Sequence, residues 1–151
     1  MEKLKKPFNG RPHWMNALMI FCAYMTFIYM PFDLFYKPVG QDAEVWFGYM
    51  LHGWAAKVTE PLHWFIYGAG FFGFLKLKRW MFPWAALYVV QVAIGMAVWP
   101  LLYREADWWI GVLIGLPFAV LAVMLWRAKS QFNGIVPEAI DLEHQDDKLP
   151  K

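Results

Sequence analysis

Residues 81–103 read MFPWAALYVVQVAIGMAVWPLLY and contain no charged side chain. An α-helix rises about 1.5 Å per residue, so a helix of this length could cross the roughly 30 Å hydrocarbon core of a bilayer. Three other charge-free runs occur in the chain, at 14–32, 61–75 and 108–126. The pattern therefore predicts four membrane-spanning helices.

The composition of the 151-residue chain agrees with a membrane protein. Hydrophobic residues make up 60% and charged residues 17%, against roughly 45–50% and about 25% in ordinary soluble domains. The run at 61–75 reaches spanning length only if Lys76 and Lys78 extend to the interface, which gives a span of 61–78. We expect an all-α integral membrane protein with a four-transmembrane-helix bundle over 14–128. A basic segment, 1–13, precedes it, and a polar, disordered tail, 129–151, follows.

Basic residues gather on one side of the predicted membrane. Those expected inside are Lys3, Lys5, Lys6, Arg11, Lys76, Lys78, Arg79, Arg127 and Lys129, against Lys37, Lys57 and Arg104 outside. By the positive-inside rule both termini are cytoplasmic, and this topology accounts for the basic clusters without nucleic acid. The single cysteine, Cys22, excludes a disulfide within the chain but leaves the compartment open. A bacterial inner membrane and the endoplasmic reticulum membrane both fit.

The loop between the first two spans is patterned like a helix. In QDAEVWFGYMLHGWAAK, residues 41–57, Asp42 could cap a helix, and five apolar residues follow at helical spacing. They are Val45, Trp46, Tyr49, Met50 and Trp54. We therefore expect a short helix at the outer interface, or one that dips over the bundle as a lid.

Small residues indicate where helices approach one another. Gly111 and Gly115 form a GxxxG motif, and Ala93 and Ala97 repeat the same spacing. Such faces allow close packing within the bundle, or in a homodimer or a contact with a membrane-complex partner.

Polar residues at membrane depth need a partner or a function. Asp33 follows Pro31 at the end of the first run; it lies either among headgroups near Lys37 or at a cavity. Gln91 lies well inside its helix, one turn from Tyr88, so it either bonds to another helix or lines a polar pocket.

The stretch KVTEPLHWFIYG, residues 57–68, places Glu60 and His63 three residues apart around Pro61. Proline is favoured in the first turn of a helix, and an acid there is stabilised by the helix dipole, so a helix start explains Glu60–Pro61. A carboxylate-bridged metal site needs a second Glu-x-x-His copy, which the chain lacks. A bis-histidine haem needs imidazoles on facing helices, whereas His52 and His63 lie on one side. We expect no metal and no cofactor.

The order of four motifs resembles the EXPERA family, the four-helix membrane domain shared by the emopamil-binding protein and the sigma-2 receptor. The motifs are MPFDLF (30–35), TEPLHWF (59–65), KLKRWMFPWAALYVVQ (76–91) and GLPFAVLAVMLWR (115–127). The resemblance implies a pocket within the bundle for sterols or cationic amphiphiles, with Asp33 and Glu60 as its acids and Tyr88 and Gln91 in its lining. Family members usually have an acid in the second helix, and 65–74 has none.

Two hypotheses follow. The first is a membrane protein that binds a sterol- or isoprenoid-like lipid in this pocket, through the ligand-binding candidates Asp33, His52, Glu60, Trp64, Tyr88 and Gln91. Should it be an enzyme, it would isomerise a lipid double bond, with Glu60 or Asp33 as acid and His63 or His52 as base. The second hypothesis is a non-enzymatic accessory or assembly subunit of a larger membrane complex.

Overall fold

The computed structural model describes residues 11–103 and 107–133. Its first helix is continuous through three segments: α2 (His13–Tyr24), the π-helical η2 (Met25–Tyr29) and α3 (Met30–Phe35). Pro31 lacks the N–H that would bond to Phe27, and a proline ring crowds the preceding turn. The wider π-helical turn just before it fits the proline into a helix that continues to Phe35. Pro31 therefore lies within this helix, which ends at Phe35.

The segment expected as a short interfacial helix is a β-hairpin. After the short 3-10 helix η3 (Val39–Gln41), strand β1 (Ala43–Trp46) pairs antiparallel with β2 (Tyr49–His52), with Trp46 opposite Tyr49. Phe47 and Gly48 have φ values of 52° and 90°, as a two-residue type I′ turn requires. The spacing of apolar residues in this stretch fits both a helix and a β-hairpin, and the turn at Gly48 decided for the hairpin.

Helix α4 (Trp54–Leu75) starts seven residues before Pro61, so Glu60 and Pro61 do not mark a helix start. Gly53 has a φ of 58° and ends the hairpin, and the helix begins at the next residue. The extra turns carry Lys57, Glu60 and His63 into the helix. Interactions of these side chains with neighbouring segments, described below, outweigh the local preference of proline for a first turn.

Helices α5 (Met81–Tyr103) and α6 (Trp108–Arg127) pack closely against each other. A Cβ atom added to Gly111 would lie 2.9 Å from the carbonyl oxygen of Ala97, and one added to Gly115 would lie 2.9 Å from that of Ala93. The GxxxG motif and the Ala93/Ala97 face are therefore used against each other within the chain. Gly111 and Gly115 are buried in this contact, so they present no free surface for the predicted homodimer or complex contact.

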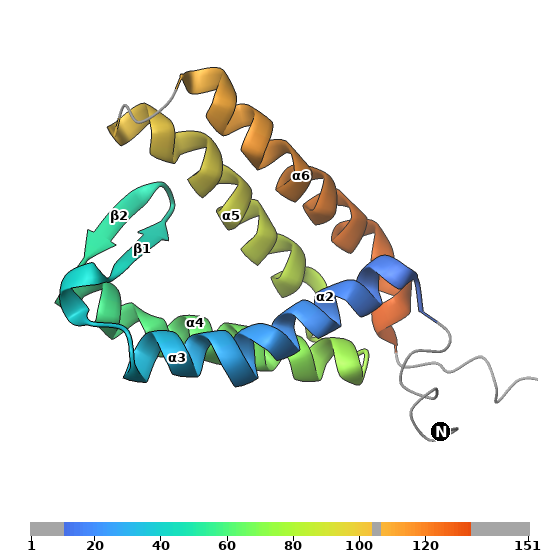
Figure 1. Cartoon of the computed structure of the whole chain (residues 1–151). Helices are drawn as coiled ribbons and strands as arrows, with labels where there is room; N and C mark the ends of the chain where they lie inside the picture. The colour runs from blue at the N-terminus through green and yellow to red at the C-terminus, as the bar shows by residue number, and fades with distance from the viewer. Residues whose placement is uncertain (1–10, 104–106, 134–151) are drawn as a thin grey trace, which may run out of the picture.

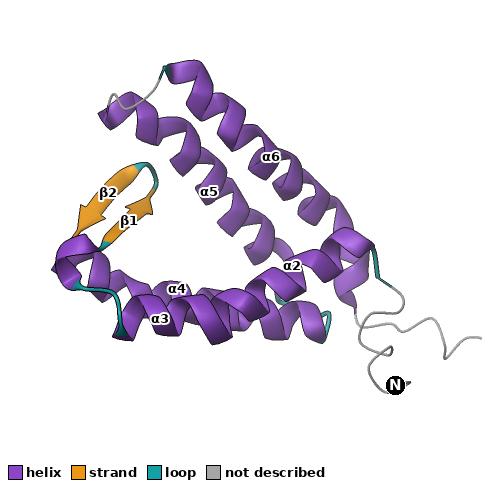
Figure 2. Cartoon of the chain, viewed as in Figure 1, coloured by secondary structure: helices purple, strands orange, loops and turns teal. Residues whose placement is uncertain are grey.

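The helices form two pairs that meet at one end and diverge at the other (Figure 1). The helix of α2 and α3 runs along α4, and α5 runs along α6. At the end where the pairs meet, the core contains Met15, Met19, Phe74, Met81 and Leu125. The hairpin, whose two strands are orange in Figure 2, lies between the diverging ends of the helix pairs. It contacts α4 and α5.

The chain after α6 continues as a 3-10 helix, η4 (Ala128–Asn133), whose Phe132 is 1% exposed. Residues 129–133, the start of the predicted tail, form part of this 3-10 helix, and Phe132 packs against Phe74 in the core. The rest of that tail, and most of the basic segment 1–13, lie outside the described residues.

Three helices of the described chain are long and apolar enough to cross a membrane: His13–Phe35, Met81–Tyr103 and Trp108–Phe132. This agrees with a membrane protein. Helix α4 has 22 residues but is not among them, because its first turns carry Lys57, Glu60 and His63. Four membrane spans are thus not confirmed.

Candidate functional site

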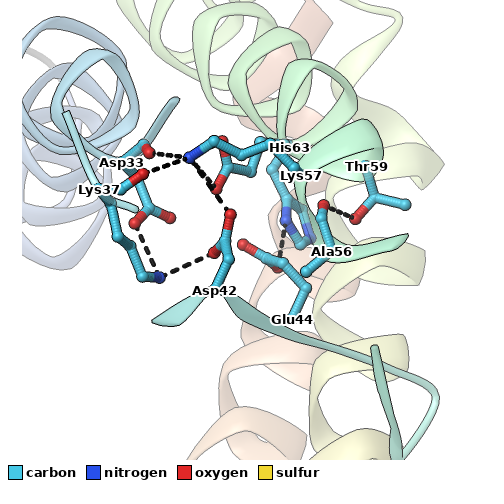
Figure 3. Close-up of polar contacts among 9 residues, drawn as sticks. Asp33, Lys37, Asp42, Glu44, Ala56, Lys57, Thr59 and His63 are labelled. Carbon is cyan, nitrogen blue, oxygen red and sulfur yellow. Dashed lines mark hydrogen bonds and ion pairs between the residues drawn. The ribbon is translucent and has the colours of Figure 1, made fainter. Parts of the chain in front are cut away.

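Charged side chains from α3, from the segment that joins α3 to the hairpin, and from α4 meet in a buried cluster (Figure 3). We call it the charge cluster, and it comprises Asp33, Lys37, Asp42, Lys57 and Glu60. The exposed fraction of its three acids is 2% for Asp33, 2% for Asp42 and 0% for Glu60. Buried charges are costly unless they are paired. The pairing in this cluster therefore decides whether these acids are free to bind a ligand.

Two lysines neutralise the acids. Lys37 Nζ lies 2.9 Å from Asp33 Oδ1 and 2.9 Å from Asp42 Oδ1. Lys57 Nζ lies 3.3 Å from Asp42 Oδ2 and 3.4 Å from Glu60 Oε2. It also donates to the backbone carbonyl oxygens of Asp33 and Lys37. The two ammonium groups thus tie the base of the hairpin to both α3 and α4.

Three carboxyl groups facing two ammonium groups favour retention of a proton. Burial, and then interaction with Asp42, raise the pKa of Glu60 to about 7. Burial alone would raise the pKa of Asp42, but hydrogen bonds from Glu60, Lys37 and Lys57 outweigh it and lower that pKa to about 2. Below about pH 7, Glu60 therefore retains its proton beside an ionised Asp42.

One oxygen from each of Asp33, Glu44 and Glu60 lies within 4.8 Å of the other two, a spacing that could hold a metal ion. Lys57, however, already places its ammonium group against Glu60 and against the backbone of Asp33. With a proton retained on Glu60, the two lysines balance the remaining carboxylates of Asp33 and Asp42. We therefore give the charge cluster a structural role.

A second polar contact joins α4 to β1. His63 Nδ1 lies 2.8 Å from Glu44 Oε2, and the His63 ring stacks on Trp46 with centroids 4.2 Å apart. Glu60 and His63, three residues apart on α4, thus have different partners. Their spacing in sequence serves two neighbouring attachments of α4 to the hairpin region.

A cavity of about 880 Å³ lies among α2, β1, α4, α5 and α6. It is lined by aliphatic and aromatic side chains, with Tyr67, Tyr88 and Gln91 as polar exceptions and no charged residue. The tip of the hairpin contributes Trp46 and Phe47. The hairpin therefore forms part of the cavity wall, and the charge cluster holds the hairpin in place.

The structure divides the predicted site residues between these two regions. Tyr88 and Gln91 line the cavity, whereas Asp33 and Glu60 belong to the charge cluster and are not among the described residues that line the cavity. Trp64 contacts Phe35 and donates a hydrogen bond of 2.8 Å to the carbonyl oxygen of Thr26. His52 is exposed at the end of β2.

Sequence reasoning expected Lys37 near Asp33 but missed Asp42 and Lys57. It also missed Glu44 as the partner of His63. One signal was present: acids and lysines alternate through 33–60, next to an apolar run. It could have predicted the two local ion pairs, four and three residues apart, but not their connection through Asp42, because that depends on how the segment before the hairpin folds.

Comparison with protein-family models, curated proteins and solved structures finds no match for this chain.

Proposed function

We propose that this protein binds one lipid-like, predominantly hydrophobic molecule in the cavity between its two helix pairs. The observation that carries the proposal is the cavity itself, with a volume of about 880 Å³ and a lining that is apolar except at a few positions. Small-molecule sites commonly have volumes of about 300–1,000 Å³, mostly apolar walls and a few convergent polar groups. A sterol- or isoprenoid-like molecule has the matching size and polarity.

The surroundings of the cavity support a ligand that arrives from the bilayer. Its walls include residues of the three helices that are long and apolar enough to span a membrane. We propose that the part of α4 after Pro61 is a fourth membrane-embedded segment, with both termini cytoplasmic. This arrangement would be EXPERA-like, although the binding proposal does not depend on that resemblance.

The proposal is for binding and does not extend to isomerisation of a double bond. An acid that protonates an alkene must reach the ligand. Asp33 and Glu60 are both paired with lysines and absent from the described cavity lining. They serve the site indirectly, by holding the hairpin.

The test is native mass spectrometry and lipid extraction of the full chain purified in mild detergent. We expect one bound lipid per chain. The variant Ala69→Phe puts a bulky ring at a cavity-lining position and should lose this lipid, whereas Ala55→Phe, at an exposed position on the same helix, should keep it. The proposal is wrong if folded wild-type protein carries no lipid and takes up none, or if both variants retain it equally.

A further inference from the structure

The polar groups of the cavity lie toward its hairpin end. Trp46 stacks on His63, the His63 and Tyr67 rings are 6.3 Å apart, and the Tyr67 and Tyr88 rings are 6.4 Å apart. These contacts lead from β1 across α4 to α5. One turn beyond Tyr88 on α5 lies Gln91.

The same region of α5 also contacts the hairpin turn. A Cβ atom added to Gly95 would lie 3.4 Å from the backbone nitrogen of Gly48. Gln91 is one helical turn before Gly95, so it lies between the tyrosine contact and the turn. The opposite end of the cavity is apolar, with Leu18, Phe74, Met81 and Leu125. The cavity is therefore polar at one end only.

Two polar groups at this end lack a protein partner. Trp46 Nε1 is a buried donor with no hydrogen bond among the described residues. The side chain of Gln91 likewise makes no hydrogen bond with any described residue. A buried donor without an acceptor is unfavourable, and a polar side chain at membrane depth usually serves a ligand or a partner.

We infer that the ligand carries one uncharged oxygen function, a hydroxyl or a carbonyl, which forms a hydrogen bond with the Gln91 side chain at the hairpin end. Its hydrocarbon part extends toward Phe74, Met81 and Leu125. The inference rests on the proposed function and narrows its ligand class.

Charge argues against an ionic ligand. No charged side chain is among the described residues of the cavity lining. Of the nearby acids, Asp33, Asp42 and Glu60 are engaged by Lys37 and Lys57 in the charge cluster. Glu44 is engaged by His63. A cationic or anionic head at this end would therefore lose its hydration without gaining a counter-charge. A neutral oxygen gains hydrogen bonds at a much smaller desolvation cost.

The experiment compares three probes with one carbon skeleton: farnesene, farnesol and farnesylamine. Their equilibrium binding to the full chain is measured in the same detergent. We expect farnesol to bind about fivefold to tenfold more tightly than farnesene, as one hydrogen bond of ordinary strength would give. Farnesylamine should bind no better than farnesol.

The matched variants are Gln91→Met, which keeps the length of the side chain, and Gln41→Met, at an exposed position in η3. Gln91→Met should abolish the preference for farnesol while farnesene still binds, and Gln41→Met should leave the preference unchanged. Continued binding of farnesene shows that the variant is folded.

Each other outcome overturns a defined claim. Equal binding of farnesol and farnesene to the wild type, or an undiminished preference in Gln91→Met, removes the oxygen subsite and leaves the proposed function standing. Tightest binding of farnesylamine shows that the ligand is cationic. Failure of all three probes to bind folded protein contradicts the proposed function as well.

Discussion

His63 Nδ1 lies 2.8 Å from Glu44 Oε2, and this contact joins the middle of a helix to a strand of the hairpin. The same imidazole ring stacks on Trp46, which lines the cavity. A polar attachment outside the cavity thereby fixes an aromatic wall inside it. The hairpin therefore connects the charge cluster to the apolar cavity.

Replacing His63 with alanine should loosen the hairpin. The change removes the contact with Glu44 and the stacking on Trp46, at a cost of about 1–2 kcal/mol in unfolding free energy. Hydrogen exchange of the β1 and β2 amides should become faster. His52→Ala, at an exposed position in β2, is the control and should change little. Unaltered exchange in His63→Ala would show that His63 does not hold the hairpin.

Replacing Lys57 with methionine should destabilise the whole chain. The change leaves buried Asp42 and Glu60 with too little positive charge, and removing one partner of a buried ion pair costs about 3–5 kcal/mol. Thermal unfolding in detergent measures the effect. Lys78→Met, at an exposed position, should unfold close to the wild type. Similar midpoints for the two variants would contradict the role of Lys57 in the charge cluster.

Stability should depend on the ionisation of Glu60. Its pKa in the folded protein is about 7, above the ordinary 4.5, so its contribution to stability is full below pH 4.5. That contribution declines as the pH rises to about 7, by up to about 1.4 kcal/mol for each unit of pKa difference. Glu60→Gln keeps a donor toward Asp42 but cannot ionise.

We therefore expect Glu60→Gln to have a flatter profile of unfolding midpoint between pH 4.5 and pH 7. It should also be more stable than the wild type at about pH 8, where Glu60 is ionised. The exposed Asp107, replaced by asparagine, gives a control that should follow the wild-type profile. Parallel profiles for Glu60→Gln and the wild type would show that Glu60 ionises normally in the folded protein.

Gly48→Ala should separate the hairpin from α5. Gly48 has a φ of 90°, and an added Cβ atom would lie 2.6 Å from Cγ1 of Val98. Strain and steric conflict together should cost about 1–3 kcal/mol and should weaken lipid binding, since Trp46 and Phe47 form part of the cavity wall. Gly40→Ala, with no atom within 4 Å of the added Cβ, is the control. Equal stability and binding in both variants would refute this account of the turn.

The sequence predicted those helices that can be recognised from consecutive residues alone. The runs at 14–32, 81–103 and 108–126 correspond to three candidate spans, because length and apolarity suffice to recognise such a helix. The contact of Gly111 and Gly115 with α5 was also among the expected alternatives. Small residues at four-residue spacing allow close packing, and their neighbours are adjacent in the chain.

The segment between Pro31 and Pro61 was predicted poorly, because its structure depends on contacts between distant residues. Val45, Trp46, Tyr49 and Met50 fit a helix or two short strands equally well. Gly48, at a turn that needs a positive φ, decides for the hairpin. In the same way Pro61 fits a helix start, yet α4 begins at Trp54.

The sequence by itself thus determined an apolar, membrane-type helical protein, since hydrophobic length is a property of consecutive residues. It also marked Asp33, Glu60, Tyr88 and Gln91 as polar groups that need an explanation. Only the tertiary structure decided which explanation applies to each. Asp33 and Glu60 pair with lysines nearby in sequence, and Asp42 joins the two pairs into one buried cluster. Tyr88 and Gln91 instead line a cavity. The reason is physical: the role of a buried polar group depends on its surroundings, and Asp42 and the cavity walls come from other segments of the chain.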